Sequence, residues 1–114
     1  MKMNNPLYCS KAARKVKPCS RLEGEIVLPG DKSISHRAVI LNSLAKGKAK
    51  IDNFAPGKDC LATVRCLRDL GVKIRRKVCG NSTTLLVSGI AEDRLKEPAN
   101  VLDAGDSGTT MRLL

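Results

Sequence analysis

Aromatic residues are almost absent from the sequence, which has one tyrosine, one phenylalanine and no tryptophan among 114 residues. Proteins that bind single-stranded nucleic acid stack bases on aromatic side chains, so this shortage disfavours a base-stacking surface. Long apolar runs are missing too, and no stretch approaches the roughly 18 consecutive apolar residues of a membrane-spanning helix. With 42% hydrophobic and 28% charged residues, the composition is typical of a single soluble domain.

Metal-binding and disulfide patterns are also missing. The sequence contains five cysteines and a single histidine, His36, and no two cysteines form a C-x-x-C pair. Structural zinc sites use four cysteine or histidine ligands at short spacings, so no metal site is expected. We interpret the cysteines as free thiols in a reducing cytosol, which predicts a cytoplasmic protein.

Acidic residues are in short supply. Lysine and arginine number 21 against 11 aspartates and glutamates, a formal net charge of +10, which attracts anions of any kind. Residues 1–20 are basic and contain no acid, and we interpret them as a leader that is mobile or ordered only by a partner. The lack of an apolar h-region excludes a secretory signal, and the shortness of the segment disfavours the alternative, an organelle transit peptide.

Strand and helix signals alternate after this leader. Residues 25–28 ("EIVL") predict a strand that ends at Pro29-Gly30, and residues 33–47 predict a helix with Gly47 just past its end. The buried stripe of this helix is predicted from apolar residues at helical spacing: Ile34, Ala38, Leu41 and either Leu44 or Ala45.

The next elements complete a βαβαββ order and an α/β (α+β) fold. Residues 48–54 predict a strand, and residues 59–70 a helix capped by Asp59 and stopped by Gly71. Its predicted stripe is Leu61, Val64, Leu67 and Leu70. The β-type runs 72–79 and 82–90 meet at Gly80-Asn81, which predicts a hairpin.

A second unit begins after the charged linker at residues 91–99. Residues 100–105 predict a strand and residues 106–114 a helix. Gly30-Asp31 precedes Arg37 by the same interval as Gly105-Asp106 precedes Arg112, which favours a repeat, with about one and a half copies present. The last helix has no C-cap, so we interpret residues 21–114 as the N-terminal part of a truncated domain.

The two strand-to-helix junctions carry the functional signal. The first, "GDKSISHR", places cations in the first turn of a helix, where each costs a few tenths to about 1 kcal/mol because the helix dipole is positive there. Such a cluster indicates an expected anion: Lys32, Ser33 and Arg37 are predicted to converge on a phosphate or carboxylate. Ser33 as a plain N-cap is the alternative, which leaves Lys32 and Arg37 unexplained.

The second junction, "GDSGTT", repeats this arrangement. Asp106 or Ser107 is predicted to cap the helix, while Gly108 allows a ligand to approach the backbone. A purely structural turn is the alternative. His36 has no acidic neighbour in sequence, so we interpret it as solvent-facing or packed against the turn. Lys73, Arg75, Arg76 and Lys77 predict a basic hairpin face, either solvated or RNA-binding. The P-loop spacing is absent, which disfavours a nucleotide triphosphatase.

Three segments together resemble a known family. The runs "LPGDKSISHRAVILNSLAKGKAKIDNF", "DCLATVRCLRDLGV" and "DAGDSGTTMRLL" are similar in order and spacing to the N-terminal part of the 5-enolpyruvylshikimate-3-phosphate synthase family. The UDP-N-acetylglucosamine enolpyruvyl transferase family looks similar but has Lys-Asn where this chain has Lys32-Ser33. The resemblance therefore implies shikimate 3-phosphate as a substrate.

The resemblance implies transfer of the enolpyruvyl group of phosphoenolpyruvate to the 5-hydroxyl of shikimate 3-phosphate, without metal or organic cofactor, by a monomeric enzyme in aromatic amino acid biosynthesis. It implies an inside-out α/β barrel of βαβαββ units. Lys32 would be catalytic and contact both substrates, and Ser33 and Arg37 would hold shikimate 3-phosphate. Gly108, with Asp106 and Ser107, would line the phosphoenolpyruvate site.

The chain departs from the family at Asp106, where asparagine is usual, and we expect this carboxylate to act as a helix cap. The family's catalytic acid and base belong to a C-terminal domain, which would be the partner of this segment, so the chain alone is expected to be inactive. An RNA-binding or RNA-processing module, similar to RNA 3′-terminal phosphate cyclases, and a structural fragment without a ligand remain the alternatives.

Overall fold

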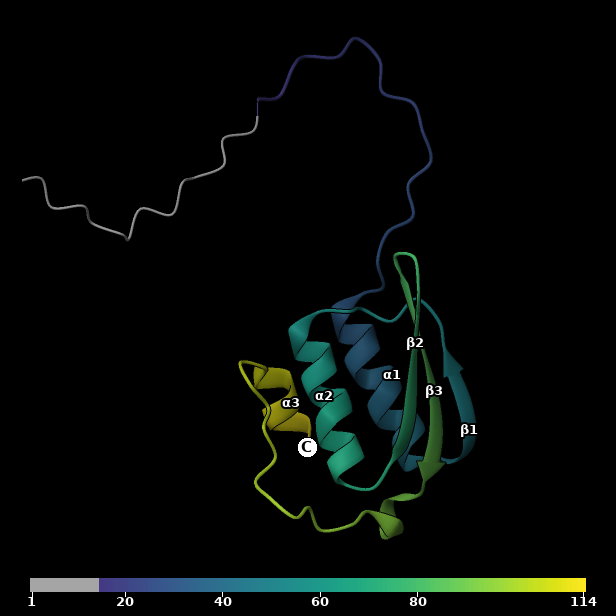
Figure 1. The fold of residues 1–114 in the computed structure, drawn as a ribbon, viewed down its shortest axis with the longest axis vertical. Coiled ribbons are helices and arrows are strands. Elements are labelled where there is room, and N and C mark those ends of the chain that lie inside the picture. The colour runs from purple at the N-terminus through teal and green to yellow at the C-terminus, as the bar shows by residue number, and fades with distance from the viewer. Residues whose placement is uncertain (1–14) are drawn as a thin grey trace, which may run out of the picture.

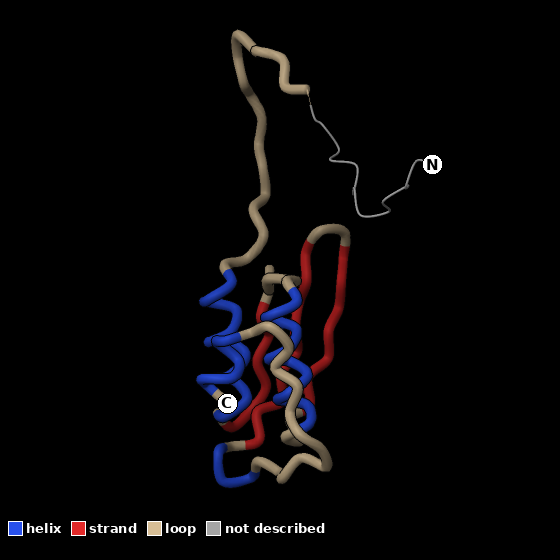
Figure 2. Tube along the Cα trace, turned by 90° about the vertical axis from the view of Figure 1, so that its left-hand side faces the viewer, coloured by secondary structure: helices blue, strands red, loops and turns tan. Residues whose placement is uncertain are grey.

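The computed structural model describes residues 15–114 of the chain. Its elements run in the order α1 (Lys32–Leu44), β1 (Lys46–Ile51), α2 (Lys58–Asp69), β2 (Lys73–Cys79), β3 (Ser82–Ile90), a 3-10 turn η1 (Glu92–Arg94) and α3 (Gly108–Leu113). The helices form one layer and the strands the other (Figures 1 and 2). The predicted α/β class is confirmed, whereas most of the predicted leader at residues 1–20 lies outside the described residues.

The sheet is three-stranded and antiparallel, with β3 in the centre and β1 and β2 at its edges. The hairpin predicted at Gly80-Asn81 is confirmed, because β2 and β3 pair from Lys73 opposite Ser88 to Cys79 opposite Ser82. Gly80 adopts a φ of 56°, a left-handed conformation that glycine reaches without strain. β1 pairs with the other edge of β3. In the sequence, α2 and β2 lie between these two neighbouring strands.

The core lies between the sheet and the helices. Leu85 and Val87 of β3 are almost fully buried and face Val39 of α1 and the apolar side of α2. The predicted stripe of α2 is confirmed at Val64 and Leu67, which are 2% and 0% exposed. Gly71, with a φ of 95°, lies just after the C-cap of the helix, as predicted. Burial of these side chains, at about 25 cal/mol per Å² of apolar surface, is the main force that holds the layers together.

The helix predicted at residues 33–47 forms as α1, but only part of its predicted stripe is buried. Ala38 and Leu44 are half-buried, and Leu44 packs against the core. Ile34 and Leu41 are 62% and 65% exposed. The buried face consists instead of Ser35, His36, Val39, Ile40 and Ser43. Small polar residues on this side allow α1 to approach the sheet and α2 closely, so the apolar pattern alone indicated only part of the buried face.

The end of α1 also differs from the prediction. Gly47 does not follow the helix directly but lies within β1, and Ala45 is the C-cap in an extended conformation. Similarly, Asp59 does not cap α2, because Gly57 occupies the N-cap position and Asp59 lies in the first turn.

Two predicted strands are absent from the described residues. Residues 25–28 are extended but pair with no strand, and Val27 is 89% exposed; the segment runs away from the folded layers (Figures 1 and 2). Residues 100–105 form an irregular segment in which Val101 is 96% exposed. A strand requires a neighbour for its backbone hydrogen bonds, and neither segment has one, so the observed order is αβαββ followed by α3.

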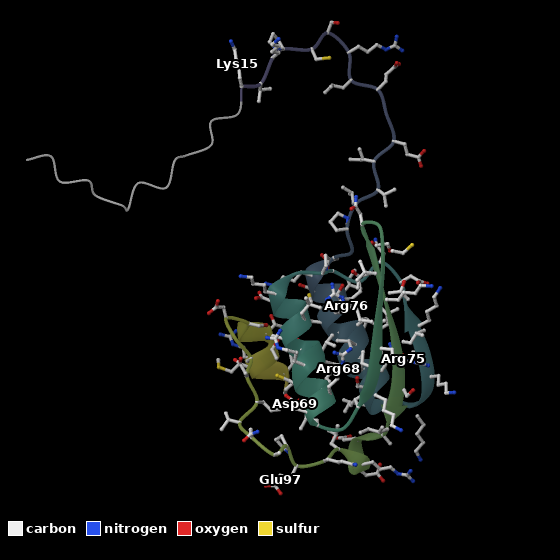
Figure 3. The ribbon with its side chains drawn as sticks, viewed as in Figure 1. Lys15, Arg68, Asp69, Arg75, Arg76 and Glu97 are labelled. Carbon is white, nitrogen blue, oxygen red and sulfur yellow. The ribbon has the colours of Figure 1, made fainter. Side chains whose placement is uncertain are left out.

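The predicted basic hairpin face is divided between the two sides of the sheet. Arg76 lies opposite Leu85, on the helical side, whereas Arg75 lies opposite Leu86 on the outer side. Strand side chains alternate between faces, so Lys73 and Lys77 share the outer side with Arg75 but Arg76 does not. In Figure 3, Arg76 lies toward the helices and Arg75 over the strands.

Candidate functional site

The first junction is built around a close backbone approach. A Cβ atom on Gly30 would lie 1.8 Å from the carbonyl oxygen of Asn53, so glycine is required here for packing against the loop after β1. Asp31 then caps α1, because its Oδ1 accepts a hydrogen bond of 2.7 Å from the Ile34 amide. The cap that was considered for Ser33 therefore belongs to Asp31, which leaves the Ser33 hydroxyl without that role.

Lys32 reaches across to the start of the second helix. Its ammonium group forms an ion pair and hydrogen bond with Oδ2 of Asp59, in the first turn of α2. This hydrogen bond is the main reason why the pKa of Lys32 is raised and that of Asp59 is lowered. The pair is partly exposed, with 59% of the Lys32 side chain accessible, so the ammonium group is open to a ligand.

Ser33 and Arg37 lie together on the exposed face of α1. The Arg37 Nε donates a hydrogen bond of 3.2 Å to the carbonyl of Ser33, one turn earlier. The structure thus brings Ser33 to Arg37 and Lys32 to Asp59, but it does not bring all three predicted donors to one point. The guanidinium Nη groups form no hydrogen bond within the described residues, which leaves them available for an anion.

The second junction is capped by Ser107, one of the two residues predicted for this role. Ser107 is the N-cap of α3, and its Oγ accepts a hydrogen bond of 3.1 Å from the Thr110 amide. Asp106 is exposed and does not cap the helix, so the expectation for this carboxylate was wrong. A Cβ atom on Gly108 would meet no atom within 4 Å; the space beside this backbone is open.

A hollow of about 370 Å³ joins the second junction to the start of α2. Asp59, the partner of Lys32, lines it together with Gly105 and Asp106. The remaining lining residues include two cations, Lys58 and Arg65. All three helices begin at the same end of the helical layer (Figure 1), so their unpaired amides add positive potential to that of the side chains.

His36 is neither solvent-facing nor idle. It is 0% exposed, and its Nδ1 lies 2.7 Å from Oγ1 of Thr63 on α2. The prediction of a packed residue is confirmed, and that of a solvent-facing one is wrong. Asp59, Thr63 and Thr110 were all missed as parts of this region. An acid in the first turn of the second helix was the one available signal for Asp59, since it could balance Lys32.

Burial makes His36 a source of acid sensitivity. Desolvation lowers its pKa below 6.5, nearby Lys32 lowers it further, and Asp59 opposes them. The unfolded chain therefore binds a proton more readily than the folded one, so the free energy of unfolding should fall as the pH drops below about 6.5. Chemical denaturation between pH 7.5 and 5 measures this loss. Asp59 loses its stabilising charge only below 3.8, because its pKa is lowered from that value, and Lys32 loses its own only above 10.5.

His36→Asn is the control for that experiment. This variant should show a flat dependence over the same pH range, and a slope equal to that of the parent would assign the acid sensitivity to another group.

No metal or membrane feature accompanies this region. Within residues 15–114, no three histidine, cysteine, aspartate or glutamate side chains are placed to hold a metal ion. Nor is any of the described helices long and apolar enough to cross a membrane.

Comparison with known proteins identifies the family. A family model described as EPSP synthase (3-phosphoshikimate 1-carboxyvinyltransferase) matches residues 16–114. Enzymes named 3-phosphoshikimate 1-carboxyvinyltransferase from Geobacillus kaustophilus and Roseiflexus sp. are 57% and 54% identical over 83% and 87% of this chain. The structure of EPSP synthase from Acinetobacter baumannii superposes with a TM-score of 0.70 at 40% identity, over 79% of this chain and 20% of that one. The chain spans 21% and 22% of the two curated relatives. On this evidence of sequence and fold, the chain belongs to the EPSP synthase family.

Proposed function

We propose that this chain supplies the first part of the substrate site of a 3-phosphoshikimate 1-carboxyvinyltransferase. The observation that carries the proposal is the position of Asp59, which pairs with Lys32 of the first junction and lines the same hollow as Gly105 and Asp106 of the second. The two glycine-bearing junctions are thus neighbours in space. Cations and helix N-termini at this end suit two anionic substrates.

Lys32 is proposed as the catalytic residue of this segment. Its ammonium group pairs with Asp59, and because the pair is partly exposed, a phosphate or carboxylate can replace the aspartate as its partner. Between phosphoenolpyruvate and shikimate 3-phosphate, this charge would stabilise the negative charge that develops during addition, a role worth several kcal/mol when closure excludes water.

The other proposed roles follow the exposed groups. Ser33 and Arg37 would bind shikimate 3-phosphate, for which the free guanidinium nitrogens offer a bidentate fork. Gly108, with the backbone of Asp106 and Ser107, would line the phosphoenolpyruvate site, since the space beside Gly108 is open. The exposed Asp106 carboxylate can turn toward solvent, so it does not block an anion at the backbone.

The reaction would proceed by addition and elimination. The 5-hydroxyl oxygen bonds to C2 of phosphoenolpyruvate and loses its proton, while the methylene carbon gains one, which gives a tetrahedral ketal. The bond from C2 to the phosphate oxygen then breaks, a proton leaves the methyl group, and the enol ether forms. The acid and base for these transfers would come from the C-terminal domain of the parent enzyme, so the 114-residue chain alone is proposed to be inactive.

A chimera tests the proposal. Residues 16–114 replace the matching segment of the Geobacillus kaustophilus relative, which is 57% identical over 95 residues, and phosphate release is measured with both substrates. We expect steady-state turnover within about tenfold of the parent enzyme, a barrier difference of about 1.4 kcal/mol. A folded chimera that binds neither substrate would refute the proposed function.

Gly108→Ala should separate the two substrates. The added methyl group meets no protein atom, and alanine favours a helix over glycine by about 0.5–1 kcal/mol, so the fold should be unharmed. In the chimera, we expect the KM for phosphoenolpyruvate to rise at least about tenfold, which corresponds to about 1.4 kcal/mol, with little change for shikimate 3-phosphate. Equal rises for both substrates would contradict the assignment of Gly108.

A further inference from the structure

A chain of hydrogen bonds between buried side chains connects the three helices. It runs from His36 of α1 through Thr63 of α2 to Thr110 of α3 and ends at Ser107, the N-cap of α3. The three successive contacts, from His36 Nδ1 to Thr63, from Thr63 to Thr110 and from Thr110 to Ser107, are each 2.7 Å long. The exposures of these four side chains range from 0% to 2%, so water does not compete for these bonds.

The number of hydroxyl hydrogens fixes the direction of the chain. The Thr110 hydroxyl donates to Ser107 Oγ, and the Asp59 carbonyl oxygen is a second, longer acceptor at 3.5 Å. Each hydroxyl has only one hydrogen, and with either acceptor that of Thr110 is not available to Thr63. Thr63 must therefore donate to Thr110, which leaves it no hydrogen for the imidazole. It follows that His36 Nδ1 carries a proton and donates to Thr63.

The opposite nitrogen of the ring supports this assignment. His36 Nε2 is buried and has no hydrogen-bond partner within the described residues. In the Nδ1–H tautomer the unpaired Nε2 is an acceptor, whereas the Nε2–H tautomer would bury an N–H donor without a partner, which is rarer in folded proteins. Protonation at both nitrogens would bury a cation without a counter-charge in contact. The charged groups that act on the ring are Lys32 of α1 and Asp59 of α2, which pair with each other.

We propose that His36, Thr63 and Thr110 form a positioning network that holds the second junction in register with the first, and that the network fixes His36 as the Nδ1–H tautomer. Ser107 accepts from both the hydroxyl and the amide of Thr110, so the geometry at the start of α3 depends on how the chain is oriented at the histidine. Only the use of this register in substrate binding rests on the proposed function; the network itself does not.

The sequence offers a direct measurement, because His36 is the only histidine. Long-range ¹H–¹⁵N correlation spectra of the 114-residue chain at pH 7.5, without any substrate, report both ring nitrogens. We expect a protonated, pyrrole-like Nδ1 and a bare, pyridine-like Nε2. A ring protonated at Nε2, or two averaged nitrogen shifts, would overturn the proposal, and this test needs no variant.

A double-mutant cycle tests transmission along the network. Thr110→Val keeps the amide that bonds to Ser107 but removes the hydroxyl, so it should move the His36 ring nitrogens by several ppm toward averaged values although it does not touch the ring. When Thr63 is already valine, adding Thr110→Val should cause no further change in the nitrogen shifts. The single variant Thr63→Ser keeps the hydroxyl and should give the same spectrum as the parent chain. Unchanged nitrogen shifts in a folded Thr110→Val variant would refute transmission.

Thr83→Val provides the matched control. Thr83 is 2% exposed on β3 and lies outside the network, so its replacement should leave the His36 ring nitrogens unchanged. A shift as large as that of Thr110→Val would show that any buried threonine produces the effect, which would overturn the proposal. Because these spectra contain no substrate, they can fail while the chimera remains active, and the reverse holds too.

Discussion

Lys32→Ala in the chimera is expected to lower kcat at least about 100-fold, a loss of roughly 2.7 kcal/mol of transition-state stabilisation. Alanine removes the charge proposed to lie between the two substrates. The guanidinium of Arg37 would not replace it, because that group is proposed to bind shikimate 3-phosphate. Stability should change little, since the lost ion pair is partly exposed and such pairs contribute about 0–1 kcal/mol. Steady-state phosphate release and denaturation measure the two effects.

Lys77→Ala is the matched control for that experiment. Lys77 pairs with Thr84 and faces the outer side of the sheet, opposite to the side that the helices cover, so the same loss of one positive charge should leave kcat unchanged. If both variants lost activity equally, net charge and not position would be responsible. Unaltered kinetics in Lys32→Ala would remove it from the catalytic role.

Gly89→Ala is expected to cause a large loss of stability. A Cβ atom at this position would lie 2.0 Å from the carbonyl oxygen of Ala45 and 2.4 Å from that of Asn42. Both atoms belong to the backbone at the end of α1, so relief requires the helix and the central strand to move apart. We expect a cost of about 3 kcal/mol or more, the upper range for overpacking, and a fall in Tm of about 12 °C or more.

Gly108→Ala is the comparison variant for thermal unfolding, since the same chemical change there meets open space. It should unfold at or slightly above the temperature of the parent. A Gly89→Ala variant as stable as Gly108→Ala would show that the end of α1 is far more adaptable than its contacts with the sheet indicate.

Local sequence signals predicted the positions of the helices and the hairpin well, but they did not predict which face of α1 is buried. In α1 the apolar residues Ile34 and Leu41 are exposed, while Ser35, His36 and Ser43 are buried. Ser35 and His36 find partners outside the helix, in the bond from the Ala55 amide to Ser35 Oγ and the contact of His36 Nδ1 with Thr63. A single helix carries no information about such partners, so hydrophobicity alone indicated only part of the buried face.

The two junctions illustrate a second limit. Their matching Gly-Asp pairs predicted two equivalent junctions, with Ser33 as a possible cap of the first and Asp106 or Ser107 as the cap of the second. In the structure Asp31 caps α1 and Ser107 caps α3. α3 begins one residue later relative to its glycine than α1 does, so the interval to the arginine is conserved in sequence but not in helical position. The convergence of the two junctions could be inferred only from the resemblance, because Asp59, which links them, lies in a different element.

The extended segment before α1 is expected to favour self-association at high concentration. Residues 26 to 28 are three consecutive large apolar residues, 80%, 89% and 67% exposed, and their backbone groups have no ladder to join. Such a stretch is a template for intermolecular β-pairing. Glu25 and Pro29 flank this stretch, and a charge and a proline both disfavour intermolecular strand pairing. Protection of this segment from aggregation would therefore depend on these two residues.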